Sequence, residues 1–290
     1  MARRTTHWTT RRVETAPGVL IDVAEHGERG GRPVLLLHGF PQTHRCFDAL
    51  AARLDARTHG RALRLLAPDQ RGYSPGARPA AVQAYALREL VSDALRVLDA
   101  YGVESVDVVG HDWGSILAWN LAARHAERVR TLTAVSVPHP RAMAAALADP
   151  ESGQAGRSSY MKLFRLPGKA EEVLLADGAA RLRALFDPLS DEAAEPHVSA
   201  LGTPDALTPA LNWYRAMRTE DSLSLPEVGV PTTFVWSSAD VAIGRAAAEH
   251  CAAHVAGPYR FVELDGISHW IPDQAPGALA EAVADRLGPC

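Results

Sequence analysis

The stretch GHDWGS, residues 110–115, follows a short apolar run and opens a segment with helical periodicity. Its spacing, Gly110–x–Asp112–x–Gly114, has the outline of a nucleophile elbow, G-x-S-x-G, a sharp strand-to-helix turn that presents a nucleophilic side chain. The central position holds Asp112, where a serine esterase would hold serine. The question is therefore which chemistry needs a carboxylate at this turn.

Short apolar runs alternate with longer helical patterns on both sides of this turn. We interpret six of the runs as strands, at residues 34–40, 63–69, 106–112, 129–137, 232–238 and 259–264. Each run is apolar on both faces, which is typical of a parallel sheet covered by helices. Between them, residues 83–101 and 114–126 carry apolar side chains at helical spacing. This alternation predicts an α/β fold with a mostly parallel central sheet flanked by helices.

The alternation stops between residues 139 and 226. This stretch contains no convincing buried strand, and its apolar periodicity predicts helices within 171–186 and 205–219. We therefore predict a helical cap over 139–226 and a core made of residues 1–138 and 227–290.

The composition excludes several classes of protein. A length of 290 residues suits one large α/β domain with an insertion. The net charge of −4, from 30 basic and 34 acidic residues, gives no reason to expect nucleic acid or an anionic membrane as a partner. No run approaches the roughly 18 apolar residues that span a membrane. The first twelve residues lack the apolar centre of a signal peptide, and we expect them to form a frayed basic end.

The cysteines and histidines do not form a ligand pattern. Cys46, Cys251 and Cys290 lie far apart with no C-x-x-C pair, so we expect no disulfide framework and a cytoplasmic location. The 12 histidines are scattered, without H-E-x-x-H or a Cys/His cluster, so no metal is expected.

Polar residues with catalytic potential follow the predicted strands. Asp112, Asp240 and His269 each come after an apolar run, and ligands of open α/β sheets bind at the carboxyl ends of the strands. The order nucleophile, acid, histidine is that of the α/β-hydrolase triad. Asp265 and Asp273 are weaker candidates for the acid, because they lie too close in sequence to His269.

The whole chain resembles the α/β-hydrolase fold, and within it the epoxide hydrolases with an Asp nucleophile, which are related to the haloalkane dehalogenases. In that fold the cap is inserted after the sixth strand. The resemblance covers nearly the whole chain, and the Asp-containing elbow is its most specific part. Its motifs are HGFP (38–41), GHDWGS (110–115), Asp240 after WSSA, ISHW (267–270), SYMKLFRLPG (159–168) and LNWYRAM (211–217).

The resemblance agrees with elementary chemistry. A serine that attacked an epoxide would give an ether, which water does not cleave in such a site, whereas Asp112 gives an ester. A carboxylate needs no activating base, so His269 is free to deprotonate the water that hydrolyses this ester. Asp240 would orient the imidazole. The resemblance implies an epoxide hydrolase that needs no cofactor.

The resemblance also implies supporting groups. The oxyanion of the hydrolytic step would be bound by the backbone N–H groups of Phe40 and Trp113. Tyr160 and Tyr214, in the two cap motifs, would donate to the epoxide oxygen, since a phenol is a neutral donor at pH 7. DQRG (69–72) is expected to be a loop lock built on hydrogen bonding between its Asp and its Arg. Aromatic cap residues are expected to form the substrate pocket, namely Phe164 and Trp213.

Two other functions remain as alternatives. A haloalkane or haloacid dehalogenase would share the Asp nucleophile, but Phe40 offers no side-chain donor to a halide, and that chemistry leaves the two cap tyrosines unexplained. A non-catalytic receptor of the same fold is the second alternative, because fold does not fix function. The expected partners are a small apolar epoxide and water, without nucleic acid or a membrane span, and the sequence is compatible with a homodimer.

Overall fold

An eight-stranded sheet forms the centre of the protein in a computed structural model that describes residues 7–57 and 62–288. The order of its strands is β1-β2-β4-β3-β5-β6-β7-β8. β1 pairs antiparallel with β2 and β2 antiparallel with β4, and every other neighbouring pair is parallel. The strands are β1 (Thr9–Ala16), β2 (Val19–Gly27), β3 (Arg32–Leu37), β4 (Leu63–Asp69), β5 (Val106–His111), β6 (Val129–Val135), β7 (Thr232–Ser237) and β8 (Tyr259–Leu264).

The helices fall into two groups, those that flank the sheet and those inserted between β6 and β7. The flanking α-helices are α1 (Asp48–Arg57), α2 (Leu87–Ala100), α3 (Trp113–Arg124), α11 (Arg245–Glu249), α12 (Ile271–Gln274) and α13 (Pro276–Leu287). Short 3₁₀ helices are η1 (His44–Phe47), η2 (Val82–Tyr85), η3 (Ala126–Arg128), η4 (Pro150–Ser152) and η5 (His250–His254). The inserted α-helices, called the cap helices below, are α4 (Pro140–Ala148), α5 (Gln154–Arg157), α6 (Met161–Phe164), α7 (Lys169–Ala184), α8 (Asp191–Leu201), α9 (Pro204–Ala216) and α10 (Thr219–Leu223).

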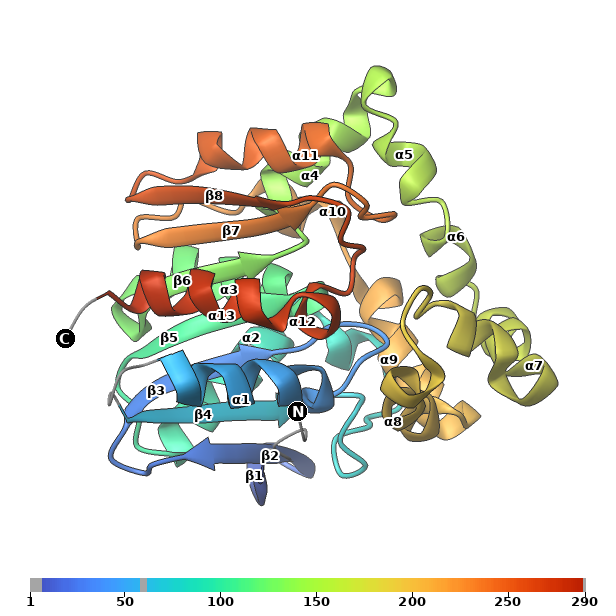
Figure 1. Cartoon of the computed structure of the whole chain (residues 1–290). Coiled ribbons are helices and arrows are strands. Elements are labelled where there is room, and N and C mark those ends of the chain that lie inside the picture. Colours follow the sequence, from blue (N-terminus) through green and yellow to red (C-terminus); the bar gives the residue numbers. More distant parts are fainter. Residues whose placement is uncertain (1–6, 58–61, 289–290) are drawn as a thin grey trace.

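The sheet separates two hydrophobic cores. Successive side chains of a strand point to opposite faces, and in β3 Val34 and Leu36 join one core while Leu35 and Leu37 join the other. α1 and α13 cover the first face, and α2 and α3 cover the second (Figure 1). Burial on both faces explains why β3 is a continuous apolar run.

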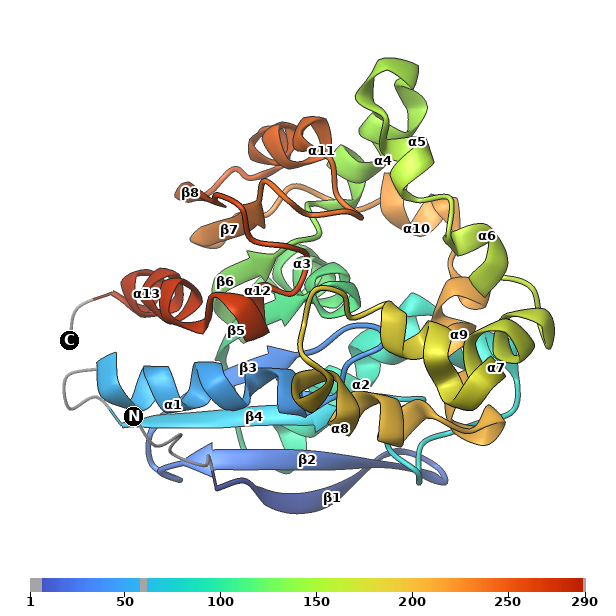
Figure 2. The same ribbon diagram turned by 45° about the vertical axis from the view of Figure 1, so that its right-hand side comes forward.

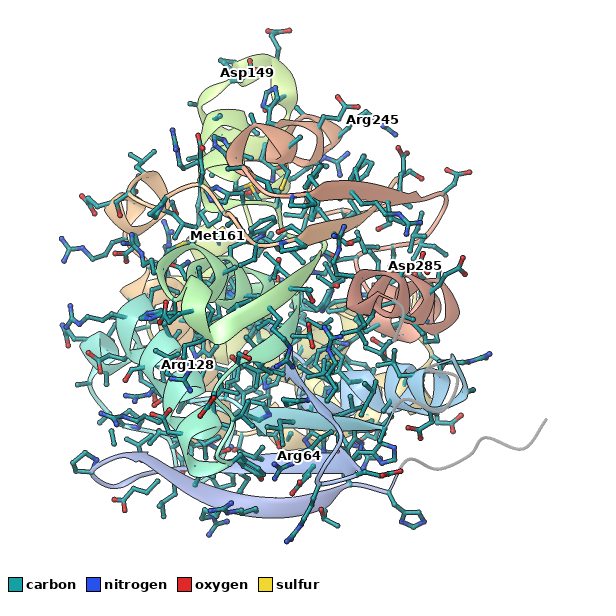
Figure 3. The ribbon with its side chains drawn as sticks, turned by 90° about the vertical axis from the view of Figure 1, so that its left-hand side faces the viewer. Arg64, Arg128, Asp149, Met161, Arg245 and Asp285 are labelled. Atoms are coloured by element: carbon teal, nitrogen blue, oxygen red, sulfur yellow. The ribbon has the colours of Figure 1, made fainter. Side chains whose placement is uncertain are left out.

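The cap helices α5 to α9 gather at one end of the sheet (Figure 2). They stand beyond the ends of β3, β5 and β6, where the polar motifs follow the strands. The first cap helix, α4, packs against α11 of the core. Figure 3 shows Asp149, at the end of α4, and Arg245, at the start of α11, together at this side of the molecule.

The predicted α/β class, with helices inserted after the sixth strand, is confirmed. Three details differ. The sequence did not predict β1 and β2, and residues 9–12 belong to β1 rather than to a frayed end. β8 is an edge strand with exposed Arg260 and Glu263, so it is not buried on both faces. α7 is broken by non-helical backbone at 176–179.

Two findings concern the described residues only. Within 7–57 and 62–288, no helix has the length and apolar character needed to cross a bilayer. The start of the basic N-terminal segment and Cys290 lie outside these ranges.

Candidate active site

Asp112 occupies a strained turn between β5 and α3. Its backbone angles are φ 54° and ψ −121°, and few non-glycine residues adopt a positive φ. A Cβ on Gly110 would collide with the carbonyl of Gly114, and a Cβ on Gly114 would collide with the carbonyl of Leu37. The two glycines of the motif are therefore required by close backbone approach, and the turn that they allow places the buried Asp112 carboxylate beyond the end of β5, in the wall of a cavity.

The two oxygens of the Asp112 carboxylate have different partners. The backbone N–H of Phe40 donates to Oδ1 at 2.8 Å. Oδ2 lies 3.5 Å from Nε2 of His269. Trp113 begins α3 directly after the carboxylate, so its amide is among the helix N-terminal donors that have no acceptor within the helix. Both expected oxyanion donors thus flank Asp112.

His269 is paired with Asp240 on its other side. Nδ1 of the imidazole lies 2.9 Å from Oδ2 of Asp240. Oδ1 of Asp240 accepts from the amides of Ala242 at 2.8 Å and Ile243 at 3.0 Å. Burial alone would raise the pKa of Asp240. His269 and these two amides have the larger, opposite effect, so the pKa of Asp240 is lowered overall.

The two competing acids have other partners. Asp265 is exposed and accepts from the hydroxyl of Ser238 at 2.8 Å. Asp273 accepts from Nε2 of Gln42 at 2.7 Å. Among the three candidates for the triad acid, Asp240 is the one that contacts His269.

The charge state of His269 follows from its two carboxylate neighbours. Burial lowers the pKa of the imidazole, but Asp240 and Asp112 together raise it more, to about 10. The free protein at neutral pH therefore holds an imidazolium between two carboxylates. Any event that neutralises Asp112 removes one of the causes that keep this pKa high.

Tyr160 and Tyr214 are neighbours in the cavity that contains Asp112. Both line the same cavity as Asp112, and their ring centroids are 6.4 Å apart. Tyr160 is 37% exposed, but the protein atoms around its hydroxyl desolvate it, and this effect, followed by the charges of Asp112 and Asp240, raises its pKa. Burial, followed by Tyr160 and Asp112, raises the pKa of Tyr214 well above its usual range. Both phenols are therefore protonated donors at neutral pH.

The cavity has a volume of about 520 Å³. Apart from Asp112 and the two tyrosines, its wall is mainly aliphatic, with contributions from Ile116, Val137, Met143, Leu147, Met161 and Met217. Lys162, Arg165 and Arg218 also line it. A cavity of this size and character accommodates a small apolar ligand.

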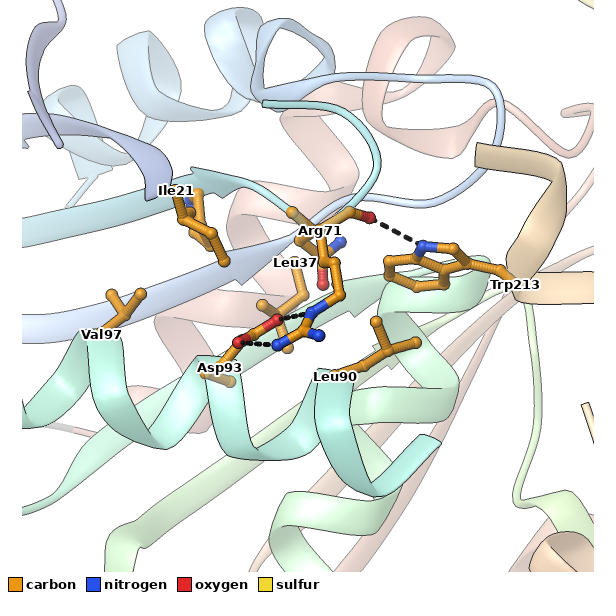
Figure 4. A pocket seen from close by; sticks show the side chains of 10 residues that line it. Ile21, Leu37, Arg71, Leu90, Asp93, Val97 and Trp213 are labelled. Carbon is orange, nitrogen blue, oxygen red and sulfur yellow. Dashed lines mark hydrogen bonds and ion pairs between the residues drawn. The ribbon is translucent and has the colours of Figure 1, made fainter. Parts of the chain in front are cut away.

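Phe164 and Trp213, expected in the pocket, do not line this cavity. Phe164 stacks edge-on against Tyr160 and Tyr214, with ring centroids 5.2 and 5.1 Å away, so it supports the tyrosines from behind. The indole N–H of Trp213 donates to the backbone oxygen of Arg71 at 2.8 Å (Figure 4). Trp213 also packs edge-on against Trp113 and therefore joins the cap to the core.

The DQRG loop (69–72) is held by hydrogen bonds to other elements, and not by the expected bond between its own Asp and Arg. Its Asp69 and Arg71 do not pair with each other. Asp69 contacts Nδ1 of His44 at 2.9 Å. The guanidinium of Arg71 makes two hydrogen bonds to Asp93 of α2, at 2.6 and 2.7 Å (Figure 4). Each side chain thus anchors the loop to a different element of the core.

Three other polar residues near the triad are already engaged in hydrogen bonds. His38 accepts from the amide of Gln70 at 3.2 Å. Nε2 of His111 lies 2.9 Å from the backbone oxygen of His269. Ser115 donates to the backbone oxygen of Val137 at 2.6 Å. These side chains support the loops beneath the site and do not face the cavity.

The part of the chain that the structure describes contains no group of three or more His, Cys, Asp or Glu side chains that could hold a metal ion. The groups around the Asp112 carboxylate are the charged imidazole of His269 and the neutral phenols of Tyr160 and Tyr214. Such a site can form and hydrolyse an ester.

Comparisons with known proteins identify the family of the chain. Residues 32–276 match the model of the alpha/beta hydrolase fold family. The chain is 32% identical to epoxide hydrolase A of Mycobacterium tuberculosis, over 96% of this chain and 97% of that protein. It is 31% identical to the AB hydrolase superfamily protein YfhM of Bacillus subtilis, over 93% and 95% of the two chains. The crystal structure of epoxide hydrolase A from Mycobacterium thermoresistibile superposes with a TM-score of 0.82 at 28% identity, covering 97% of this chain and 98% of that one.

Proposed function

The chain belongs to the α/β-hydrolase family and is an epoxide hydrolase, and from this premise we propose that it converts epoxides to vicinal diols through an ester on Asp112. The observation that carries this mechanism is the position of His269 between Asp112 and Asp240, at 3.5 and 2.9 Å. The tyrosine pair in the same cavity supports epoxides over halides as substrates.

In the first step Oδ2 of Asp112 attacks a carbon of the epoxide ring. The carbon–oxygen bond of the ring breaks, and the freed oxygen takes a proton from Tyr160 or Tyr214. Oδ1 keeps its hydrogen bond to Phe40 and becomes the carbonyl oxygen of the ester. This step neutralises Asp112, so the pKa of His269 falls from about 10.

The proton of the imidazolium now returns the tyrosinate to its neutral form. A neutral His269 remains beside the ester and can deprotonate water, which attacks Cγ of Asp112. The oxyanion that develops on Oδ1 is stabilised by the amides of Phe40 and Trp113. When the bond between Cγ and Oδ2 breaks, the departing alkoxide of the diol takes the proton of the hydroxyl group that water added to Cγ. Asp112 is thereby left as a carboxylate, and His269 keeps the proton that it took from water. The cycle thus ends with the imidazolium, the two phenols and the free carboxylate with which it began.

The proposal extends to the organisation and setting of the enzyme. We assign residues 139–226 as the cap, since this segment supplies both tyrosines and much of the cavity wall. The aliphatic wall supports a small apolar epoxide as substrate. Cys46 and Cys251 are buried free thiols, which supports a reducing cytoplasmic setting.

The test is product identification with a panel of styrene oxide, alkyl epoxides, fatty-acid epoxides and haloalkanes. We expect vicinal diols from at least one class of epoxide and no halide release at a comparable rate. Faster halide release than diol formation would contradict the proposal, and saturable binding without any product would indicate a receptor.

A further inference from the structure

Gln154 of cap helix α5 holds the segment that carries the triad acid. We call residues 238–244, which follow β7 and contain Asp240, the acid loop. Gln154 is fully buried, and its side-chain amide uses both ends on this loop. Oε1 accepts from the backbone N–H of Gly244 at 2.8 Å, and Nε2 donates to the backbone oxygen of Ala242 at 2.7 Å.

Arg157, one turn further along α5, makes a second attachment to the same loop. Its Nη1 donates to the backbone oxygen of Asp240 itself at 2.7 Å. There is little free space between the two segments, because a Cβ on Gly244 would lie 3.3 Å from Oε1 of Gln154 and 3.4 Å from Nε of Arg157. α5 and the acid loop are therefore packed and bonded as one unit.

These bonds bear on catalysis because they hold the residues that orient Asp240. The carboxylate of Asp240 is fixed by the amides of Ala242 and Ile243, at 2.8 and 3.0 Å. Gln154 binds the carbonyl of the same Ala242. Without Gln154, the buried amide of Gly244 and the partly buried carbonyl of Ala242 would both lose their partner, which favours a shift of the loop.

We propose that Gln154, assisted by Arg157, is a positioning residue for Asp240, through which the cap keeps the acid in contact with His269. This inference rests on the proposed function, in which Asp240 supports the histidine during ester hydrolysis. Hydrolysis then depends on the bonds between the cap and the acid loop, while ring opening by Asp112 does not.

The first test is Gln154→Ala in the full-length enzyme, with single-turnover measurement of the two steps. We expect hydrolysis of the alkyl-enzyme to slow by roughly 10- to 100-fold, while alkylation changes by less than about threefold. The alkyl-enzyme should accumulate and be detected by mass spectrometry of the intact protein. The matched control is Thr208→Val, which removes a 2.6 Å hydrogen bond within the cap, to Glu171, that reaches neither the triad nor the acid loop. This control should leave both steps unchanged.

The second test uses the isosteric variant Gln154→Glu, which separates positioning from general loss of structure. In this variant the ionised carboxylate at position 154 can accept from Gly244 but cannot donate to Ala242, whereas the protonated acid can do both. The charged groups near this point are the guanidinium of Arg157, which contacts Gly244 and the Asp240 backbone, and the Asp240 carboxylate, which is bonded to the amides of Ala242 and Ile243. The ratio of the hydrolysis rates of variant and wild type should therefore approach one as the pH falls through the pKa of the new carboxyl group.

The outcomes separate this inference from the proposed function. Equal hydrolysis rates in Gln154→Ala and wild type would overturn the inference, as would a ratio for Gln154→Glu that does not change with pH. An equal loss in Thr208→Val would do the same. A wild-type enzyme that forms no alkyl-enzyme and no diol would instead contradict the proposed function.

Discussion

The backbone amide of Phe40 donates a 2.8 Å hydrogen bond to Oδ1 of Asp112, so the two oxygens of this carboxylate are distinguished before any substrate binds. Oδ1 faces the oxyanion donors and Oδ2 lies nearer to His269. A carboxylate held in this way presents Oδ2 to the substrate and keeps Oδ1 where charge develops in the second step. The same turn that orients the nucleophile therefore also preorganises the hydrolysis of its ester.

The first prediction concerns Asp112. A single turnover in ¹⁸O-labelled water should place one label in the carboxylate of Asp112, because water attacks Cγ of the ester and not the substrate carbon. Peptide mass spectrometry would locate the label. Asp112→Ala should lose at least about 10⁴-fold in kcat, as expected when a covalent nucleophile is removed. Label found only in the diol would mean direct attack of water on the epoxide.

The second prediction concerns His269. His269→Gln keeps a polar side chain but removes the base, so the variant should still form the ester and then stop. Intact-protein mass spectrometry should show a persistent adduct with the mass of enzyme plus epoxide. Asp240→Asn should slow the same step less, because the imidazole remains. A folded His269→Gln variant that never becomes alkylated would show that the histidine is needed earlier.

The third prediction concerns the pH dependence of hydrolysis. His269 has a pKa of about 10 in the free enzyme, where Asp112 is negative. In the ester intermediate Asp112 is neutral, so the pKa of His269 should be lower. The rate of hydrolysis should rise with pH through this lower value and level off above it, because only the neutral imidazole is a base. Single-turnover rates from about pH 5 to about pH 10 would measure it, and NMR titration of the free enzyme provides the comparison. A rising limb centred near the free-enzyme value would refute the coupling.

The fourth prediction concerns stability. Burial raises the pKa of Asp273 to about 7, although its hydrogen bond to Gln42 lowers it and nearby Asp48 raises it. The folded state thus holds a proton that the unfolded chain releases near pH 4, so wild-type stability falls as pH rises from about 4 to about 7. Asp273→Asn does not ionise, so its advantage in the free energy of unfolding should grow by about 1–3 kcal/mol between about pH 5 and about pH 8. Urea unfolding at the two pH values measures this, and a constant difference would show that Asp273 does not titrate on folding.

The fold was predictable where its strands are buried on both faces. β3 to β7 are continuous apolar runs because helices cover both sides of them. β1 was not predicted because its first four residues, Thr9 to Arg12, are exposed and polar, and it depends on pairing with β2 rather than on burial. The break in α7 was missed although the sequence carries a signal for it, since Asp177 and Gly178 form a turn-favouring pair and both adopt a positive φ.

The candidate site was predictable where a motif marks it, as at Asp112 and His269. Residues that act through backbone bonds to distant loops carry no such signal. Gln154 reaches Ala242 across 88 positions of sequence, and the bond from Trp213 to Arg71 spans 142. We expected Trp213 to line the pocket only because it is an aromatic residue in a cap motif. Its indole N–H instead needed an acceptor, which it found in the core.

The last prediction concerns Tyr160 and Tyr214, and it separates epoxide from halide chemistry. The epoxide oxygen stays on the product and needs a proton donor as its charge develops, whereas a halide leaves without one. Loss of a hydrogen-bond donor to developing charge costs a few kcal/mol, and each 1.36 kcal/mol is tenfold in rate. Tyr160→Phe or Tyr214→Phe should therefore slow alkylation by roughly 10- to 1000-fold, with the remaining phenol still donating.

The double variant should be nearly inactive toward epoxides and still folded, because Phe keeps the rings that pack against each other and against Phe164, with centroids 5.1 to 6.4 Å apart. Circular dichroism and thermal unfolding serve as the control for structure, and stopped-flow alkylation rates as the measurement. Unchanged alkylation in the folded double variant would show that the epoxide oxygen takes its proton from a group other than these two tyrosines. Undiminished reaction with a haloalkane in the same variant would fit the assigned roles, since that reaction uses Asp112 but no proton donor.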